Sequence, residues 1–147
     1  MTRPRPNRVL KVLTPNDVGA TRSHQAGWTV PKTVVDFFPP LDPSKYNPDT
    51  WLLVGGPGGQ HWSWRFIYYN SRLHDSGTRN EYRLTHVIAA MRELGAKSGD
   101  VVEFQRIDDE IRVRLLPESN ASPGGDRRVI DLTGRPARWF VGDLAKR

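Results

Sequence analysis

"HWSWRFIYYNS", residues 61–71, is the stretch that decides the fold. It is rich in aromatic residues, which are enriched in β-strands, and its apolar positions partly alternate. In an extended chain Trp62, Trp64, Phe66 and Tyr68 fall on one face, because successive side chains of a strand point to opposite sides. Such a row is more often core than surface. We therefore expect the strongest strand of the protein here.

Further short strands are predicted on both sides of this stretch, because 12 prolines and 13 glycines interrupt the chain throughout. The expected strands lie at residues 8–13, at 28–31, at 50–56 as a buried strand, in a hairpin at 100–117, and in two closing segments at 129–134 and 138–144. Residues 118–128, between the hairpin and the closing segments, are expected to form a flexible loop.

Two short helices are predicted between these strands. One covers residues 31–38, with Pro31 near its start, and the other covers 85–95, capped by Thr85 and ended by Gly95. The sum is a mainly β domain with two short helices and about seven strands. A closed or nearly closed small barrel suits this pattern, since closure removes exposed sheet edges.

Length and composition bound the possible functions. The 147 residues suit one domain, spanning 1–147, and 22 Lys and Arg against 16 Asp and Glu leave a net charge of +6. A basic balance favours an anionic partner, most commonly nucleic acid, although a merely soluble basic protein has the same charge. The absence of cysteine excludes disulfides and thiolate chemistry. With no signal peptide or membrane-spanning stretch visible, we expect a cytoplasmic protein without a membrane partner.

The most distinctive polar feature is "HDSGTRNEYRLT", residues 74–85. In an extended chain Arg79, Glu81 and Arg83 point one way, while Asn80 and Tyr82 point the other way. The row is either a surface salt-bridge ladder of little energetic value or a ribbon that reads bases in the major groove of DNA. Guanine offers two acceptors to an arginine fork, and cytosine offers a donor to a carboxylate. A glutamate between the arginines orients them and repels phosphate, which favours base reading.

Residues around this row suit contacts with the DNA backbone. Arg72 and the hydroxyl or amide groups of Asn70, Ser71, Ser76 and Thr78 are of the kind that bind phosphate. A long polar loop, residues 14–27, has similar chemistry: Arg22 and Ser23 suit phosphate, and Gln25 suits adenine. Gly27 allows close approach of the backbone. Two polar loops on one barrel predict a pair of arms that clasp a duplex.

Two long stretches carry a family resemblance. "LTPNDVGATRSHQAGWTVPK" (13–32) and "IYYNSRLHDSGTRNEYRLT" (67–85) resemble, in order and spacing, the two hallmark stretches of the EcoRII-type restriction endonuclease N-terminal domain, which is its effector or DNA-recognition domain. The resemblance implies a DNA-binding pseudobarrel similar to plant transcription-factor domains. It also implies two arms that enter the major groove from opposite sides and a short GC-rich site of the CC(A/T)GG kind.

The resemblance, together with the residue chemistry above, defines a set of expected DNA-binding residues. Gly77 and Tyr82 stand where the family can carry lysine, and Arg22 stands where it tolerates glycine. The full set is Thr21, Arg22, Ser23, His24, Gln25, Trp28, Asn70, Arg72, Gly77, Thr78, Arg79, Asn80, Glu81, Tyr82 and Arg83.

Catalytic motifs are not visible in the chain. No Asp or Glu is followed two positions later by lysine, as restriction-type nuclease sites require, and no histidine pair has the helical spacing of a zinc site. "GGPGGQ", residues 55–60, lacks the Lys-Ser/Thr of a phosphate-binding loop. We therefore expect a recognition module of a type II restriction endonuclease, without catalytic residues, metal or cofactor, that binds double-stranded DNA. The isolated domain is expected to be a monomer in a prokaryotic cytoplasm, and the nuclease domain is expected in a C-terminal part outside this chain.

Three alternatives remain at this point. The first is a free-standing DNA-binding transcriptional regulator with the same fold. The second is a small metal-dependent nuclease that uses His24, His61 and acidic residues. The third is single-stranded nucleic-acid binding by the aromatic strand at 61–69, since aromatic rings can stack on bases.

Overall fold

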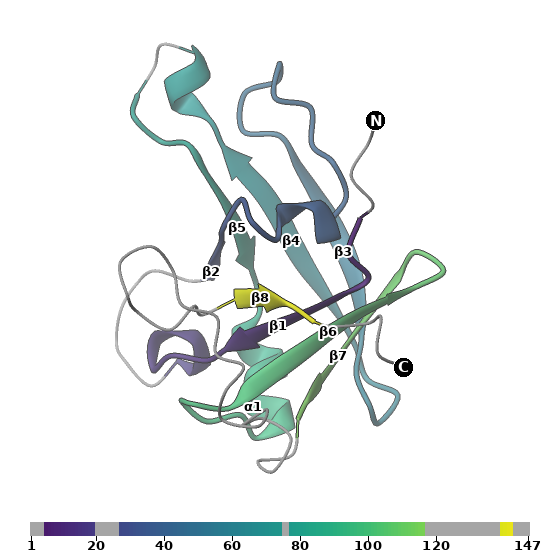
Figure 1. The fold of residues 1–147 in the computed structure, drawn as a ribbon. Helices are drawn as coiled ribbons and strands as arrows, with labels where there is room; N and C mark the ends of the chain where they lie inside the picture. The colour runs from purple at the N-terminus through teal and green to yellow at the C-terminus, as the bar shows by residue number, and fades with distance from the viewer. Residues whose placement is uncertain (1–4, 20–26, 75–76, 117–138, 143–147) are drawn as a thin grey trace.

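The computed structural model describes residues 5–19, 27–74, 77–116 and 139–142, which form one strongly curled sheet (Figure 1). The strands are β1 Arg8–Val12, β2 Trp28–Val30, β3 Asp49–Gly55, β4 His61–Tyr69, β5 Glu81–Thr85, β6 Val101–Ile107, β7 Glu110–Leu115 and β8 Trp139–Val141. One α-helix, α1 Ile88–Leu94, and three 3₁₀ turns, η1 Asn16–Val18, η2 Val35–Phe37 and η3 Ser71–His74, connect them. No helix in these ranges is long and apolar enough to cross a bilayer.

The strands follow the order β2-β5-β4-β3-β7-β6-β1-β8. Every neighbouring pair is antiparallel except β3 and β7, which run parallel and pair only at Val54 with Ile111 and Gly55 with Arg112. The sheet therefore curls as two antiparallel halves joined at a short parallel seam. The predicted pseudobarrel is confirmed, with eight strands rather than about seven in the described residues.

Aromatic rings fill the inside of the curl. Trp64 and Phe66 of β4 are fully buried, and Tyr68 is nearly so, while Trp62 is partly buried and packs against the core. The prediction that this row is core is confirmed for three of its four rings, and Trp62 lies at the edge of the core. Trp28 packs edge-on against Trp64 with ring centroids 5.8 Å apart. Because Trp64, Phe66 and Tyr68 are buried in the protein, these three rings are not available for bases to stack on.

The predicted helix at residues 31–38 is wrong. The segment has a turn at 32–34 followed by the short 3₁₀ turn Val35–Phe37, and Phe38 is already extended. This break lets the rings of Phe37 and Phe38 enter the core in a T-shaped contact 5.0 Å apart. The two prolines that follow, at positions 39 and 40, also disfavour a continuing helix, because a residue before proline is pushed toward extended backbone.

Two other local predictions need correction. The second helix ends at Gly95 as predicted, with the left-handed φ of 70° that glycine favours, but it begins at Ile88 without a side-chain cap. Thr85 does not cap it because Thr85 ends β5 and pairs with Arg65 of β4. The strand at 50–56 is buried on one face only.

The exposed face of that strand carries large apolar side chains, with Trp51 55% and Leu53 62% exposed.

The predicted closing strand at 138–144 is confirmed as β8. The predicted loop at 118–128 and the predicted strand at 129–134 lie outside the described residues.

A buried carboxylate ties the β1–β6–β7 half of the sheet together. Glu103 is 2% exposed and accepts hydrogen bonds from Arg8 Nε and Arg114 Nε, each at 2.7 Å. Burial raises the pKa of this carboxyl, but the bonds from Arg114 and Arg8 outweigh burial and hold the pKa below the usual value of 4.5. The group therefore stabilises the fold in its charged form.

Glu103→Gln is expected to lower the free energy of unfolding at pH 7 by about 1 kcal/mol, since an amide keeps an acceptor but loses the charge. A carboxyl whose folded pKa is depressed contributes stability above its ordinary pKa of 4.5 and loses it as the pH falls through the folded value. Urea unfolding at several pH values should therefore show the gap between variant and parent closing below pH 4.5. A gap that stays constant down to pH 3 would contradict the assignment.

Candidate nucleic-acid interface

The hairpin between β4 and β5 projects beyond the curled sheet (Figure 1). We call residues 70–83 the second arm and residues 14–27 the first arm. A backbone hydrogen bond joins the two sides of the second arm: the Arg72 N–H donates to the Arg79 carbonyl at 3.0 Å. The Arg79 N–H donates to Ser71 Oγ at 3.1 Å. The backbone of Arg79 is therefore hydrogen-bonded to the start of η3.

Arg79, Glu81 and Arg83, here the charged row, lie on one face as predicted. Glu81 Oε1 accepts from Arg79 Nε at 3.1 Å and from Arg79 Nη2 at 2.8 Å. Glu81 Oε2 lies 3.5 Å from Arg83 Nη1. One carboxylate thus connects two guanidinium groups and leaves the row with a net charge of +1.

Asn80 and Tyr82 take the opposite face, also as predicted. Tyr82 stacks on Tyr68 with ring centroids 4.1 Å apart, and the Tyr68 hydroxyl donates to Asn80 Oδ1 at 2.5 Å. Burial, with smaller effects of Tyr68 and Asp36, raises the pKa of the Tyr82 hydroxyl, which keeps it neutral. These two residues attach the second arm to β4.

The two arginines of the row differ in exposure. The side chain of Arg79 is 49% exposed, whereas that of Arg83 is 12% exposed. Arg83 Nη1 donates to Thr29 Oγ1 at 3.0 Å, and Nη2 donates to the Gly27 carbonyl at 3.1 Å. Arg83 therefore joins the second arm to the base of the first arm. Thr29 was not expected here, because its contact depends on the register of β2 against β5.

Arg79 has a second, unexpected neighbour. Its guanidinium carbon lies 3.7 Å from the centre of the Tyr69 ring, which is within the range of a cation–π contact. Tyr69 is the last residue of β4 and pairs with Glu81 across the strands. No local pattern in the sequence relates positions 69 and 79.

The base of the first arm is fixed by a buried ion pair. Asp17 Oδ2 lies 2.9 Å from Lys11 Nζ, and both side chains are at least nine-tenths buried. The same carboxylate oxygen accepts from the Thr14 N–H at 2.8 Å. Lys11 Nζ also lies 5.4 Å from the Trp28 ring and 5.1 Å from the Trp139 ring. The arm leaves the sheet from this cluster.

Trp28 belongs to that cluster rather than to an open surface. It is 1% exposed, and its indole N–H donates to the Asp17 carbonyl at 3.2 Å. We therefore assign to Trp28 the role of holding the arm instead of a direct contact. Gly27, next to it, has a φ of 109°, and a Cβ there would lie 2.4 Å from the Leu84 carbonyl oxygen. The close backbone approach expected at Gly27 is present.

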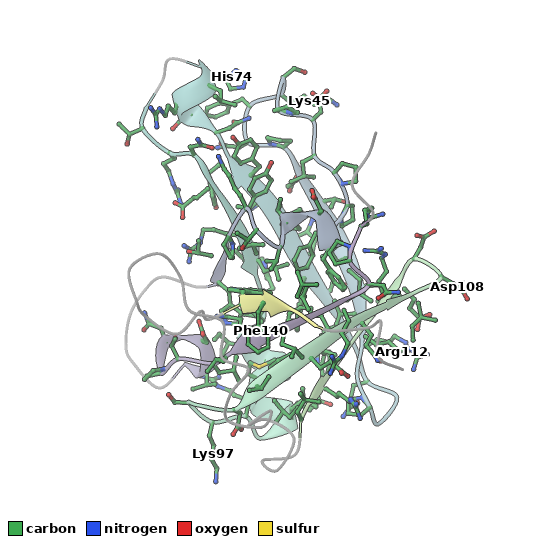
Figure 2. All side chains as sticks on the ribbon, in the orientation of Figure 1. Lys45, His74, Lys97, Asp108, Arg112 and Phe140 are labelled. Carbon is green, nitrogen blue, oxygen red and sulfur yellow. The ribbon has the colours of Figure 1, made fainter. Side chains whose placement is uncertain are left out.

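Asn70 is likewise an anchor. It is fully buried, and its amide donates to the Lys45 carbonyl at 2.7 Å and accepts from the Asn47 N–H at 2.8 Å. His74, at the end of η3, lies 3.2 Å from the Pro43 carbonyl through Nε2. Figure 2 shows Lys45 and His74 together at the far end of the molecule. The amide of Asn70 therefore positions the second arm against the loop before β3.

The remaining predicted residues fall into two groups. Arg72, Gly77 and Thr78 are exposed on the second arm. Thr21, Arg22, Ser23, His24 and Gln25 of the first arm, and Ser76 of the second, lie outside the described residues.

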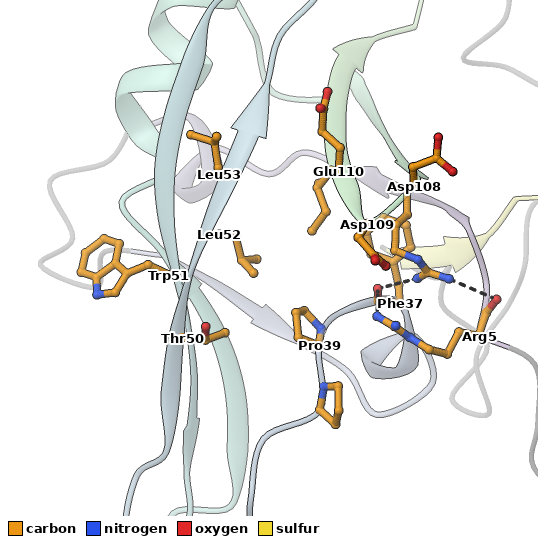
Figure 3. A pocket seen from close by; sticks show the side chains of 13 residues that line it. Arg5, Phe37, Pro39, Thr50, Trp51, Leu52, Leu53, Asp108, Asp109 and Glu110 are labelled. Atoms are coloured by element: carbon orange, nitrogen blue, oxygen red, sulfur yellow. Dashed lines mark hydrogen bonds between the residues drawn. The ribbon is translucent and has the colours of Figure 1, made fainter.

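A separate cavity of about 490 Å³ opens between β3 and the β6–β7 turn (Figure 3). The guanidinium groups of Arg5 and Arg106 there both donate to the Phe37 carbonyl, at 3.2 and 2.8 Å. Asp108 and Asp109 also line the cavity, where they would repel phosphate. Within the described ranges, no cluster of three or more His, Asp or Glu side chains could hold a metal ion.

The chain is similar to one protein family and to individual proteins of bacteria and plants. Residues 6–105 match the family model described as "Restriction endonuclease EcoRII, N-terminal". The type II restriction enzyme EcoRII of Escherichia coli is 39% identical over 85 residues, which are 55% of this chain and 21% of that protein. The B3 domain-containing transcription factor NGA3 of Arabidopsis thaliana is 33% identical over 101 residues, which are 68% of this chain and 25% of that protein.

The fold is also similar to that of a solved structure. The UbaLAI restriction endonuclease B3 domain with cognate DNA is 21% identical and has a TM-score of 0.47, over 74% of this chain and 65% of that chain. The chain thus spans only about a fifth to a quarter of the curated relatives that it matches.

Proposed function

Because the chain belongs to the family of EcoRII-type restriction endonuclease N-terminal domains, we propose that it binds double-stranded DNA in a sequence-specific way. The observation that carries this proposal is the charged row. Glu81 holds Arg79 by two hydrogen bonds on the exposed face of a projecting arm. A carboxylate at the contact surface weakens a purely electrostatic grip on phosphate, so its presence favours the reading of base edges.

The row provides the chemistry for a GC-rich site. An arginine fork suits the O6 and N7 acceptors of guanine, and the second oxygen of Glu81 suits the amino group of cytosine. The Glu81 side chain is 32% exposed, so part of the carboxylate-bearing side chain is open to solvent. We propose a short target of the CC(A/T)GG kind, read from the major groove.

Contacts with the DNA backbone are assigned to the flanks of the row. Arg72 and Thr78 are exposed on the second arm and have the donors that phosphate accepts. On the first arm, we propose that Thr21 to Gln25 enter the groove from the opposite side. The Lys11–Asp17 pair and Arg83 hold the bases of the two arms at a set separation.

We assign no catalytic role to this chain and propose that the whole protein is a type II restriction endonuclease with a separate nuclease domain. The match to a plant transcription factor favours a second candidate, a DNA-binding regulator. A full-length protein that cleaves DNA at the selected site with Mg²⁺ supports the first, and a full-length protein that binds without cleavage supports the second. In either case we propose that the isolated domain is a cytoplasmic monomer.

Selection of bound duplexes from a random library, followed by sequencing, tests the main proposal. The expected result is enrichment of one short GC-rich motif, competed by the same duplex but not by its single strands. A library that emerges without any enriched motif would leave only non-specific binding and would refute the proposal.

Glu81→Gln is expected to lower the ratio of affinities for the selected and a scrambled duplex about fivefold, roughly 1 kcal/mol. Loss of the negative charge should also strengthen binding to the scrambled duplex, since phosphate is no longer repelled. Fluorescence anisotropy at fixed salt measures both affinities. The matched control is Glu110→Gln, because Glu110 pairs with Arg112 at 2.8 Å two positions along β7, on another part of the sheet. An unchanged ratio in Glu81→Gln would contradict a role of Glu81 in discrimination.

A further inference from the structure

The Arg79 guanidinium is held on one edge and one face. Arginine has five N–H groups in a plane, and Glu81 Oε1 accepts from Nε at 3.1 Å and from Nη2 at 2.8 Å. This occupies the side edge of the plane. The Tyr69 ring, 3.7 Å from the guanidinium carbon, covers one flat face.

The end edge of the plane remains available. The protons that Glu81 does not use are the two on Nη1 and the second on Nη2, and no other described residue accepts a hydrogen bond from this guanidinium. Two of these protons point in parallel, with the spacing that a bidentate acceptor requires.

Arg83 provides an internal contrast. Its Nη1 donates to Thr29 and its Nη2 donates to the Gly27 carbonyl, so the corresponding edge of Arg83 is already used within the protein. Its side chain is also only 12% exposed. Of the two arginines in the row, Arg79 is therefore the one whose end edge has no acceptor among the described residues.

We propose that Tyr69 is a positioning residue that sets the plane of Arg79, so that the free edge of Arg79 reads a guanine through O6 and N7. This inference rests on the proposed function and assigns Arg79, rather than Arg83, to the base. A ring under the guanidinium restricts rotation out of the plane, and Glu81 restricts rotation within it. A flexible side chain thereby becomes a fixed fork before DNA binds.

The backbone of Tyr69 is held in place by contacts on both sides. It pairs with Glu81, and its two neighbours in the chain are buried. The Tyr68 N–H donates to the Pro48 carbonyl at 3.0 Å, and the Asn70 N–H donates to Asn47 Oδ1 at 3.1 Å. Tyr69 is thus part of the sheet, whereas the Arg79 guanidinium that it contacts is on the second arm.

The test compares base preference at each position of the selected site for Tyr69→Leu, Tyr69→Phe and Arg79→Ala. Tyr69→Leu should lose about 3- to 10-fold of the preference for guanine, only at the position that Arg79→Ala affects, which is the size of a cation–π contribution. Tyr69→Phe keeps the ring and should match the parent, which also separates stacking from a contact by the hydroxyl. Tyr46→Leu is the control, because Tyr46 is 57% exposed and lies outside the row.

Each result decides the inference. Tyr69→Leu with the parent's profile, or with a loss spread over all positions, overturns it, and so does a Tyr69→Phe variant that behaves like Tyr69→Leu. If Tyr69→Leu fails to fold, pentafluorophenylalanine at position 69 keeps the shape of the ring but reverses its charge distribution, and the same loss is expected. If Arg79→Ala shows no position-specific loss, base reading by the row fails instead, whatever Tyr69 does.

Discussion

Arg79→Ala is expected to bind the selected duplex about 5- to 150-fold more weakly than the parent, which corresponds to about 1–3 kcal/mol. Arg79 is the exposed member of the charged row, and its orientation is set by Glu81 and Tyr69. Removal of the side chain leaves the acceptors of one base without partners in the complex. Binding to a scrambled duplex should change much less, because only one of many charges is lost.

Equilibrium titration of both duplexes at the same salt concentration measures this effect. Arg112→Ala is the matched control, because Arg112 is 57% exposed and donates to Glu110, two positions earlier, at 2.8 Å. It removes the same charge from a pair of the same spacing, so it should weaken both duplexes equally and slightly. Equal losses on the two duplexes in Arg79→Ala would assign Arg79 to phosphate.

Asp17→Ala is expected to lower the free energy of unfolding by about 3–5 kcal/mol, since it removes the carboxylate of a buried ion pair. Lys11 is 3% exposed, and its Nζ lies 5.4 Å from the Trp28 ring and 5.1 Å from the Trp139 ring. Without Asp17, its buried ammonium group loses the carboxylate oxygen that lies 2.9 Å away. The Thr14 N–H also loses its acceptor, so the base of the first arm should loosen.

Urea unfolding followed by tryptophan fluorescence measures this loss. The control is Asp49→Ala, because Asp49 pairs with Arg65 at 2.6 Å but both side chains are about one-third exposed, so the expected loss is at most about 1 kcal/mol. The double variant Lys11→Met/Asp17→Ala should recover much of the stability, since no charge is then buried. A single Asp17→Ala variant that unfolds like the Asp49 control would contradict the buried-pair assignment.

Local errors in the sequence-based predictions have local causes. The helix at 31–38 was expected from its apolar positions, but Phe37 and Phe38 both enter the core only if the turn ends between them. Thr85 has the chemistry of a cap, yet pairing with Arg65 keeps it in β5. In both places tertiary packing overrides a local preference of the chain.

The sequence by itself determined the features that depend on local alternation. Three of the four rings in the aromatic row of β4 are core, Arg79, Glu81 and Arg83 share one face, and Asn80 and Tyr82 share the other. These follow from the two-residue period of an extended chain, which needs no knowledge of distant residues. The two hallmark stretches likewise indicated the family without a structure.

Only the tertiary structure decided what each of these side chains touches. Arg83 reaches Gly27, 56 positions away, and Trp28 and Asn70 turn inward to anchor the arms. Tyr69 lies under Arg79 because the register of β4 against β5 pairs Tyr69 with Glu81, two residues from Arg79. Strand register and the curl of the sheet set these contacts, and both arise from packing across the whole molecule, so no local pattern in the chain encodes them.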